Sequence, residues 1–282
     1  MRDYFFGYYY KFQSATRTVA VIAAKHTGAT GAGSSIQIIT DKQAWNFDYP
    51  VQSFVKLGKD PNARIGNCIF SEKGVRLSIH EKGCDVEGFI QFLSNDPIAY
   101  DIMGPFAFVP FMECKHSIYS MQSRLDGTLT INGEIFDFHG AKGYIEGDRG
   151  YSFPQKYIWT QNLFDEASLT LAVASIPFGP ASFTGVMGIV LLGNKEYRLA
   201  TYLGAYVKEV GKNRVVVAQG PYTLEARLLD KTVIPLKAPD LGNMTRMIRE
   251  NTSCKARYIF KKGSKALLDA ESPNASFEFE YD

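Results

Sequence analysis

Residues 129–136 read Leu-Thr-Ile-Asn-Gly-Glu-Ile-Phe, which places Asn132-Gly133 between two short runs of β-forming residues. Asn and Gly both tolerate a positive φ, and the two central residues of a type I′ turn require one. The stretch therefore predicts a tight β-hairpin, with one strand ending before Asn132 and the next beginning after Gly133.

Alternation of apolar and other residues extends this strand pattern along the chain. Residues 76–80, 223–228 and 277–281 each place apolar or aromatic side chains at every second position, with mostly charged or polar residues between them. A period of two is the signature of a half-buried strand. Many such strands separated by short turns predict an all-β sandwich or barrel.

Two segments depart from simple alternation. Residues 167–194 carry no charge over a length that could cross a bilayer, but Pro177, Gly179 and Pro180 interrupt them, so we expect a β-hairpin there. Residues 243–250 carry Met and Ile at helical spacing and predict one short helix. We therefore expect an all-β chain with at most one or two short helices.

Composition restricts the class of protein. The 282 residues are 45% hydrophobic and include 20 Phe and 16 Tyr, enough for a large core without a disulfide or metal. Thirty-one basic and 29 acidic residues are dispersed, which argues against a nucleic-acid partner. The four Cys form no CxxC pair and the N-terminus lacks the pattern of a signal peptide, so we expect free thiols and a cytoplasmic location.

Two short motifs resemble known sites only superficially. Gly28, Gly31 and Gly33 lack the spacing of a phosphate loop, and a strand pattern follows them, so we expect a hairpin loop. Cys114 and His116 would share one face of a strand as half of a zinc site, but no second half is visible in the sequence. We therefore expect no metal and no cofactor.

The segment 143–161 holds the most plausible chemistry. In an extended backbone Glu146 and Asp148 point to one side and Arg149 to the other. Two carboxylates in an apolar cavity can share a proton, because burial and like charge both favour the protonated form, and such a proton suits a general acid. The alternative is a charged turn in which Arg149 pairs with either carboxylate.

Aromatic residues follow this segment. Tyr157, Trp159 and Gln161 alternate onto a common strand face and would supply an aromatic wall with one amide. A domain boundary is expected near Phe153-Pro154, where the strand pattern restarts.

Three stretches in this order resemble the bacterial branch of the tocopherol cyclase family: YDIMGPFAFVPFMECKH at 100–116, GTLTINGE at 127–134 and GYIEGDRGYSFP at 143–154. The resemblance covers roughly the first 200 residues. It implies two lipocalin-like antiparallel β-barrels packed together, residues 1–153 and 154–282, with an apolar cavity as the ligand site.

The resemblance also implies a chemistry. Plant members of the family close a chromanol ring without a cofactor, by protonating a prenyl double bond. Here Glu146 or Asp148 would be the acid, and the rings of Phe153, Tyr157 and Trp159 would stabilise a cation. Gln161 would complete that wall.

Arg149 stands where the family usually has Trp. A guanidinium at this position opposes a carbocation. It could instead bind a phenolate or carboxylate of a different ligand.

Two functions from different classes remain open on this basis. The first is an enzyme that binds a hydrophobic prenylated or polyene small molecule and cyclises or isomerises it by acid catalysis. The second is a non-catalytic carrier of lipid or another hydrophobic ligand, in which residues 146–149 have only a structural role. Peripheral membrane contact would suit either function, and the sequence does not indicate an oligomeric state.

Overall fold

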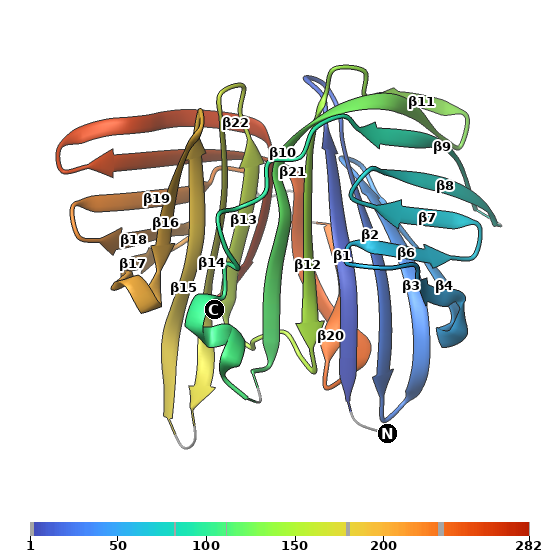
Figure 1. The fold of residues 1–282 in the computed structure, drawn as a ribbon, viewed down its shortest axis with the longest axis horizontal. Helices are drawn as coiled ribbons and strands as arrows, with labels where there is room; N and C mark the ends of the chain where they lie inside the picture. Colours follow the sequence, from blue (N-terminus) through green and yellow to red (C-terminus); the bar gives the residue numbers. More distant parts are fainter. Residues whose placement is uncertain (1–2, 82, 111, 179–180, 231–233, 282) are drawn as a thin grey trace. The chain divides into compact units, whose positions relative to one another are not determined.

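The computed structural model describes residues 3–81, 83–110, 112–178, 181–230 and 234–281 (Figure 1). Strands account for most of these residues, and within them the only helical turns are three short 3₁₀ segments: η1 (Val51–Ser53), η2 (Gly104–Phe108) and η3 (Thr201–Leu203). The predicted all-β class is confirmed. In the described part of the chain, no helix is long and apolar enough to cross a membrane.

The chain divides into two compact units, which we describe separately. Unit 1 comprises residues 1–98, 114–153 and 237–246, and unit 2 comprises residues 99–113, 154–236 and 247–282. The segments of the two units therefore alternate along the sequence. The domain limits 1–153 and 154–282 stay a prediction.

Unit 1 holds one antiparallel sheet. Its strands follow the order β4-β3-β2-β1-β12-β10-β9-β8-β7-β6-β5, and β11 pairs with β10. Their bounds are β1 (Tyr4–Gln13), β2 (Thr18–Gly28), β3 (Gly31–Thr40), β4 (Ala44–Pro50), β5 (Phe54–Lys56), β6 (Asn62–Ile65), β7 (Cys68–Ser71), β8 (Gly74–Glu81), β9 (Cys84–Phe92), β10 (Cys114–Ile131), β11 (Glu134–Asp137) and β12 (Lys142–Gly150). One face of this sheet surrounds a single core, as in a barrel.

The second sheet follows the order β16-β15-β14-β13-β22-β21-β19-β18-β17, and β20 pairs with β21. Its strands are β13 (Tyr157–Leu163), β14 (Ala167–Phe178), β15 (Ala181–Leu192), β16 (Lys195–Ala200), β17 (Tyr206–Gly211), β18 (Arg214–Gln219), β19 (Tyr222–Leu228), β20 (Ile234–Asp240), β21 (Asn243–Lys262) and β22 (Lys265–Glu280). A second core, which includes Ile158, Leu171 and Tyr258, fills unit 2.

Three hairpins expected from the sequence are confirmed. Asn132 and Gly133 have φ values of 50° and 80°, and Ile131 pairs with Glu134 across the turn. Strands β14 and β15 pair along the uncharged segment 167–194. Strands β2 and β3 pair up to Gly28 and Gly31, so the glycine-rich stretch is a hairpin loop and not a phosphate loop.

The helix predicted at residues 243–250 is wrong, because this segment begins strand β21. Met247 is 57% exposed whereas Ile248 is buried, which is the in-and-out alternation of a strand. Backbone pairing continues through residue 250, which lies opposite Glu278 of β22. Pairing with neighbouring strands therefore overrides the local helical spacing of the apolar residues.

The strand β1 shows which face of the unit 1 sheet lines the core. Phe6, Tyr8, Tyr10 and Phe12 belong to the barrel core, so the residues between them lie on the other face. Gly147 of β12 pairs with Tyr8, and a Cβ there would come within 2.8 Å of the Gly7 carbonyl oxygen. Glycine at position 147 thus allows β1 and β12 to approach closely at the centre of the candidate acidic segment.

Candidate functional site

Two carboxylates and an imidazole meet on the face of the unit 1 sheet that points away from the barrel core. Glu146 and Asp148 pair across β1 with Tyr9 and Gly7, and His116 of β10 lies directly opposite Asp148. The His116 Nδ1 lies 2.9 Å from Asp148 Oδ1, and its Nε2 lies 3.4 Å from Glu146 Oε2. Each ring nitrogen therefore faces a different carboxylate.

The two contacts restrict what the imidazole can do. A neutral imidazole can donate a hydrogen bond to only one of the two carboxylates, because its other ring nitrogen is an acceptor, whereas an imidazolium can donate to both. Both His116 and Glu146 are at most 6% exposed, which strengthens this electrostatic coupling.

Neighbouring groups extend the cluster. The Tyr144 hydroxyl donates a hydrogen bond of 2.6 Å to Glu146 Oε2, and Cys114 Sγ lies 3.5 Å from Asp148 Oδ1. Lys11 pairs with Tyr144 across β1 and β12 and is completely buried. A hydroxyl donor stabilises the ionised form of the carboxylate that it binds.

Arg149 lies on the other face of β12. It pairs with Phe6, a residue of the barrel core, and its side chain is exposed. Within the described residues, Arg149 forms no ion pair with Glu146 or Asp148. The alternative of a charged turn closed by Arg149 is thus wrong, and the expected separation of Arg149 from the two carboxylates is confirmed.

The aromatic residues expected near the acids lie in both units. Phe153 ends the central segment of unit 1, where its ring meets Phe5 edge to face at 5.4 Å. Tyr157, Trp159 and Gln161 alternate along β13 of unit 2, and all three are buried. The Tyr157 hydroxyl donates a hydrogen bond to the Glu278 carboxylate.

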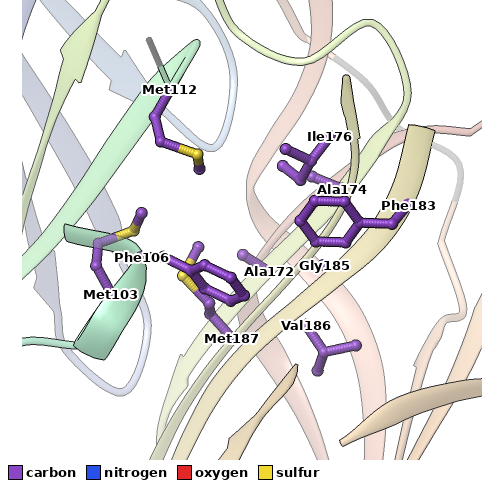
Figure 2. Close-up of a pocket in the computed structure, with 10 residues that line it drawn as sticks. All are labelled: Met103, Phe106, Met112, Ala172, Ala174, Ile176, Phe183, Gly185, Val186 and Met187. Carbon is purple, nitrogen blue, oxygen red and sulfur yellow. The ribbon is translucent and has the colours of Figure 1, made fainter. Parts of the chain in front are cut away.

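An apolar pocket lies in unit 2 (Figure 2). Its cavity volume is about 30 Å³, and the pocket is partly open to solvent. Its lining residues are Met103, Phe106, Met112, Ala172, Ala174, Ile176, Phe183, Gly185, Val186 and Met187. Ala172 of β14 pairs directly with Trp159 of β13, so the pocket lies one strand away from Trp159.

The segment 99–113 forms one wall of this pocket, and Arg198 of β16 anchors it. The guanidinium lies 3.7 Å from the centre of the Tyr100 ring and donates hydrogen bonds to the carbonyl oxygens of Tyr100 and Asp101. The Tyr202 hydroxyl donates to the carbonyl oxygen of Ile102. These contacts hold Met103 and Phe106 over the small residues of β14 and β15, where all of them line the pocket.

Glu113 is a second carboxyl group with unusual surroundings, and the sequence analysis did not single it out. Burial raises the pKa of Glu113, and its Oε2 has no hydrogen-bond partner among the described residues. It follows Met112, which lines the pocket. Unit 2 therefore has a carboxyl of its own, with a raised pKa, close in sequence to the apolar pocket.

His116, Glu146 and Asp148 are also the residues that could hold a metal ion. One donor atom from each lies within 4.8 Å of the others. From the sequence, Cys114 and His116 share a strand face but lack the other half of a zinc site, whereas the structure brings His116 together with carboxylates of β12. Only the pairing of β10 with β12, which brings together residues 32 positions apart in the sequence, shows that His116 meets these carboxylates.

Comparison with known proteins identifies the fold. No protein-family model matches the chain, and no curated protein matches it. Among solved structures, the chain is similar to kievitone hydratase from Nectria haematococca, with a TM-score of 0.58 and 9% identity over 98% of this chain and 89% of that one. It is similar to CghA in complex with Sch210972, with a TM-score of 0.63 and 8% identity over 99% and 88% of the two chains.

A third similar structure is that of a candidate AttH from Nitrosomonas europaea, with a TM-score of 0.55 and 9% identity over 100% and 93% of the two chains. Since all three identities are below 10%, the likeness concerns the fold. The chain has a lipocalin-like fold that it shares with these proteins. Membership of the tocopherol cyclase family stays a prediction.

Proposed function

We propose that this protein is a cofactor-independent enzyme that moves a proton on a hydrophobic, prenylated or polyene small molecule. The observation that carries the proposal is the buried imidazole of His116 between the carboxylates of Glu146 and Asp148. Asp148 would fix the ring orientation, and the proton held between Nε2 and Glu146 would be the one transferred. Cyclisation, isomerisation and hydration of a double bond all begin with such a step.

The apolar pocket of unit 2 supports the choice of ligand. All of its lining side chains are hydrocarbon or thioether groups, so a guest gains affinity there by burying apolar surface rather than by hydrogen bonding. Three of those residues are methionines, whose flexible side chains adapt to irregular shapes. A prenyl or polyene chain has the chemistry that this lining accepts. Kievitone hydratase and CghA, which share the fold, lend support to small-molecule chemistry but not to a particular substrate.

The second candidate function is a carrier, and the same pocket favours it. None of its lining residues is titratable, so a ligand bound there meets no proton donor in the lining itself. A carrier would bind and release its ligand unchanged. Mass spectrometry of the compound extracted from the purified protein, before and after incubation, separates the two functions.

Filling the pocket should weaken binding of a neutral apolar probe. We expect Ala172→Trp to raise the dissociation constant of N-phenyl-1-naphthylamine by roughly tenfold or more, since the indole would occupy the space of the guest and remove its apolar contacts. Fluorescence titration measures the change. Ala266→Trp, at an exposed position of β22, is the matched control and should bind the probe as the unmodified protein does. Equal affinity in a folded Ala172→Trp variant would contradict the assignment of this pocket.

A further inference from the structure

Aromatic side chains line one end of the unit 1 barrel. The ring of Phe6 lies 5.0 Å from that of Tyr8 and 5.8 Å from that of Phe54, measured between centroids. Tyr119 adds a fourth ring, 6.0 Å from Tyr8. Because Phe6 lies near the start of β1 and pairs with residues near the ends of β2 and β12, these rings mark the mouth of the barrel.

Three cationic side chains surround this aromatic group. Lys25 of β2 and Arg149 of β12 both pair with Phe6, one on each side, so the three residues form a row on the core-facing side of the sheet. The Lys25 ammonium lies 5.4 Å above the Phe54 ring, and the Lys56 ammonium lies 4.8 Å above the Phe6 ring. Cations gathered over aromatic rings make this end of the barrel attractive to an anion.

One carboxylate, that of Asp60, lies among these groups. It is 2.7 Å from the Lys56 ammonium and accepts a hydrogen bond from the Tyr8 hydroxyl. Asp60 therefore neutralises one of the three cations. Lys25 and Arg149 have no carboxylate partner among the described residues, so the mouth keeps an excess of positive charge.

Tyr10 provides an independent sign that a ligand group belongs here. It follows Tyr8 on the core face of β1, is completely buried, and its hydroxyl has no hydrogen-bond partner among the described residues. The Tyr10 ring lies 6.5 Å from that of Tyr8, between centroids, and burial raises the pKa of Tyr10, with a further contribution from Tyr8, Tyr119 and Asp60. A buried hydroxyl without a partner is costly, so an acceptor at this site would relieve it.

We propose that the mouth of the unit 1 barrel is a second small-molecule site, and that it takes an aromatic monoanion such as an aryl carboxylate. The anionic group would bind Lys25, Lys56 and Arg149, its ring would lie against Phe6 and Phe54, and the Tyr10 hydroxyl would donate to it. The site is independent of the proposed catalytic cluster, because Glu146 and Asp148 lie on the opposite face of β12. If the experiments below show that no anion binds here, the proposed function is not affected.

Two probes that differ by one sulfonate test the proposal on the full-length protein. The anion 8-anilinonaphthalene-1-sulfonate should bind here, whereas neutral N-phenyl-1-naphthylamine should not depend on these cations. We expect Lys25→Gln and Arg149→Gln each to raise the dissociation constant of the anionic probe by roughly tenfold, and added salt to do the same progressively. Lys42→Gln, in the turn at the far end of β3, removes one charge elsewhere and should change nothing.

A third variant tests the inner end of the site. Tyr10→Phe should weaken binding of the anionic probe while leaving the protein folded, because it removes only the unpartnered hydroxyl. If that hydroxyl had no ligand role, Tyr10→Phe would leave probe binding unchanged. Loss of affinity in both charge variants and in Tyr10→Phe supports the proposal. Anionic and neutral probes that bind equally well to all of these variants would overturn it.

Discussion

His116→Gln and Glu146→Gln should each slow proton transfer to the ligand by about 10²- to 10⁴-fold, the usual contribution of one positioned acid or base. Glutamine keeps much of the size and polarity of either side chain but cannot carry a transferable proton at this position. The readout is incorporation of solvent deuterium into the ligand, which is first recovered from the purified protein by organic extraction. The extract is returned to each variant in D₂O and analysed by mass spectrometry.

The chain contains a closely matched control for this experiment. His80 also lies between two carboxylates, at 2.8 Å from Asp85 and 3.4 Å from Glu87, but its side chain is 62% exposed. His80→Gln should leave deuterium incorporation unchanged, because water screens an exposed cluster and competes for its protons. If His116→Gln and Glu146→Gln exchange as fast as the unmodified protein, the cluster is structural and the carrier function is favoured.

The separation of charges in the segment 146–149 followed from the sequence because it depends only on the geometry of one strand. Glu146 and Asp148 are two residues apart, so an extended backbone places them on one face and Arg149 on the other. The Asn132-Gly133 hairpin was predictable for a similar reason, since the turn type is decided by two adjacent residues. Local rules are sufficient where the determining contacts are local.

The role of His116 required information that the sequence does not contain. It meets Asp148 through the pairing of β10 with β12, and this ladder has register shifts between Ile118 and Ser120 and again between Ser120 and Ser123. Each shift moves the following side chains relative to their partners. Spacing alone therefore placed His116 on one strand face with Cys114 and gave no sign of the two distant carboxylates.

The same limit explains the error at residues 243–250 and the membership of the two units. Met244, Met247 and Ile248 fit a helical spacing, but the pairing of β21 with strands distant in sequence decides the conformation. Residues 99–113 belong to unit 2 because Arg198 and Tyr202 bind their backbone. No local pattern in the sequence indicates either of these long-range contacts.

Phe12→Ala should cost about 3–5 kcal/mol of the free energy of unfolding of unit 1, the usual range for truncating a buried Phe. Phe12 is completely buried in the barrel core, where its ring lies 6.0 Å from that of Phe92 and 5.7 Å from that of Phe138. Its ring neighbours come from β9 and from the residue that follows β11, so truncation leaves a cavity between parts of the chain that are distant in sequence. Urea unfolding followed by tyrosine fluorescence and circular dichroism measures the change.

Ile135→Ala in β11 is the matched control, because Ile135 is 69% exposed and should change stability by no more than about 0.5 kcal/mol. The contrast tests whether the Phe12 ring is packed in the barrel core. A loss for Phe12→Ala as small as that for Ile135→Ala would contradict the burial of Phe12 between Phe92 and Phe138. A large loss would support the aromatic packing that joins β1 to β9 and to the residue that follows β11.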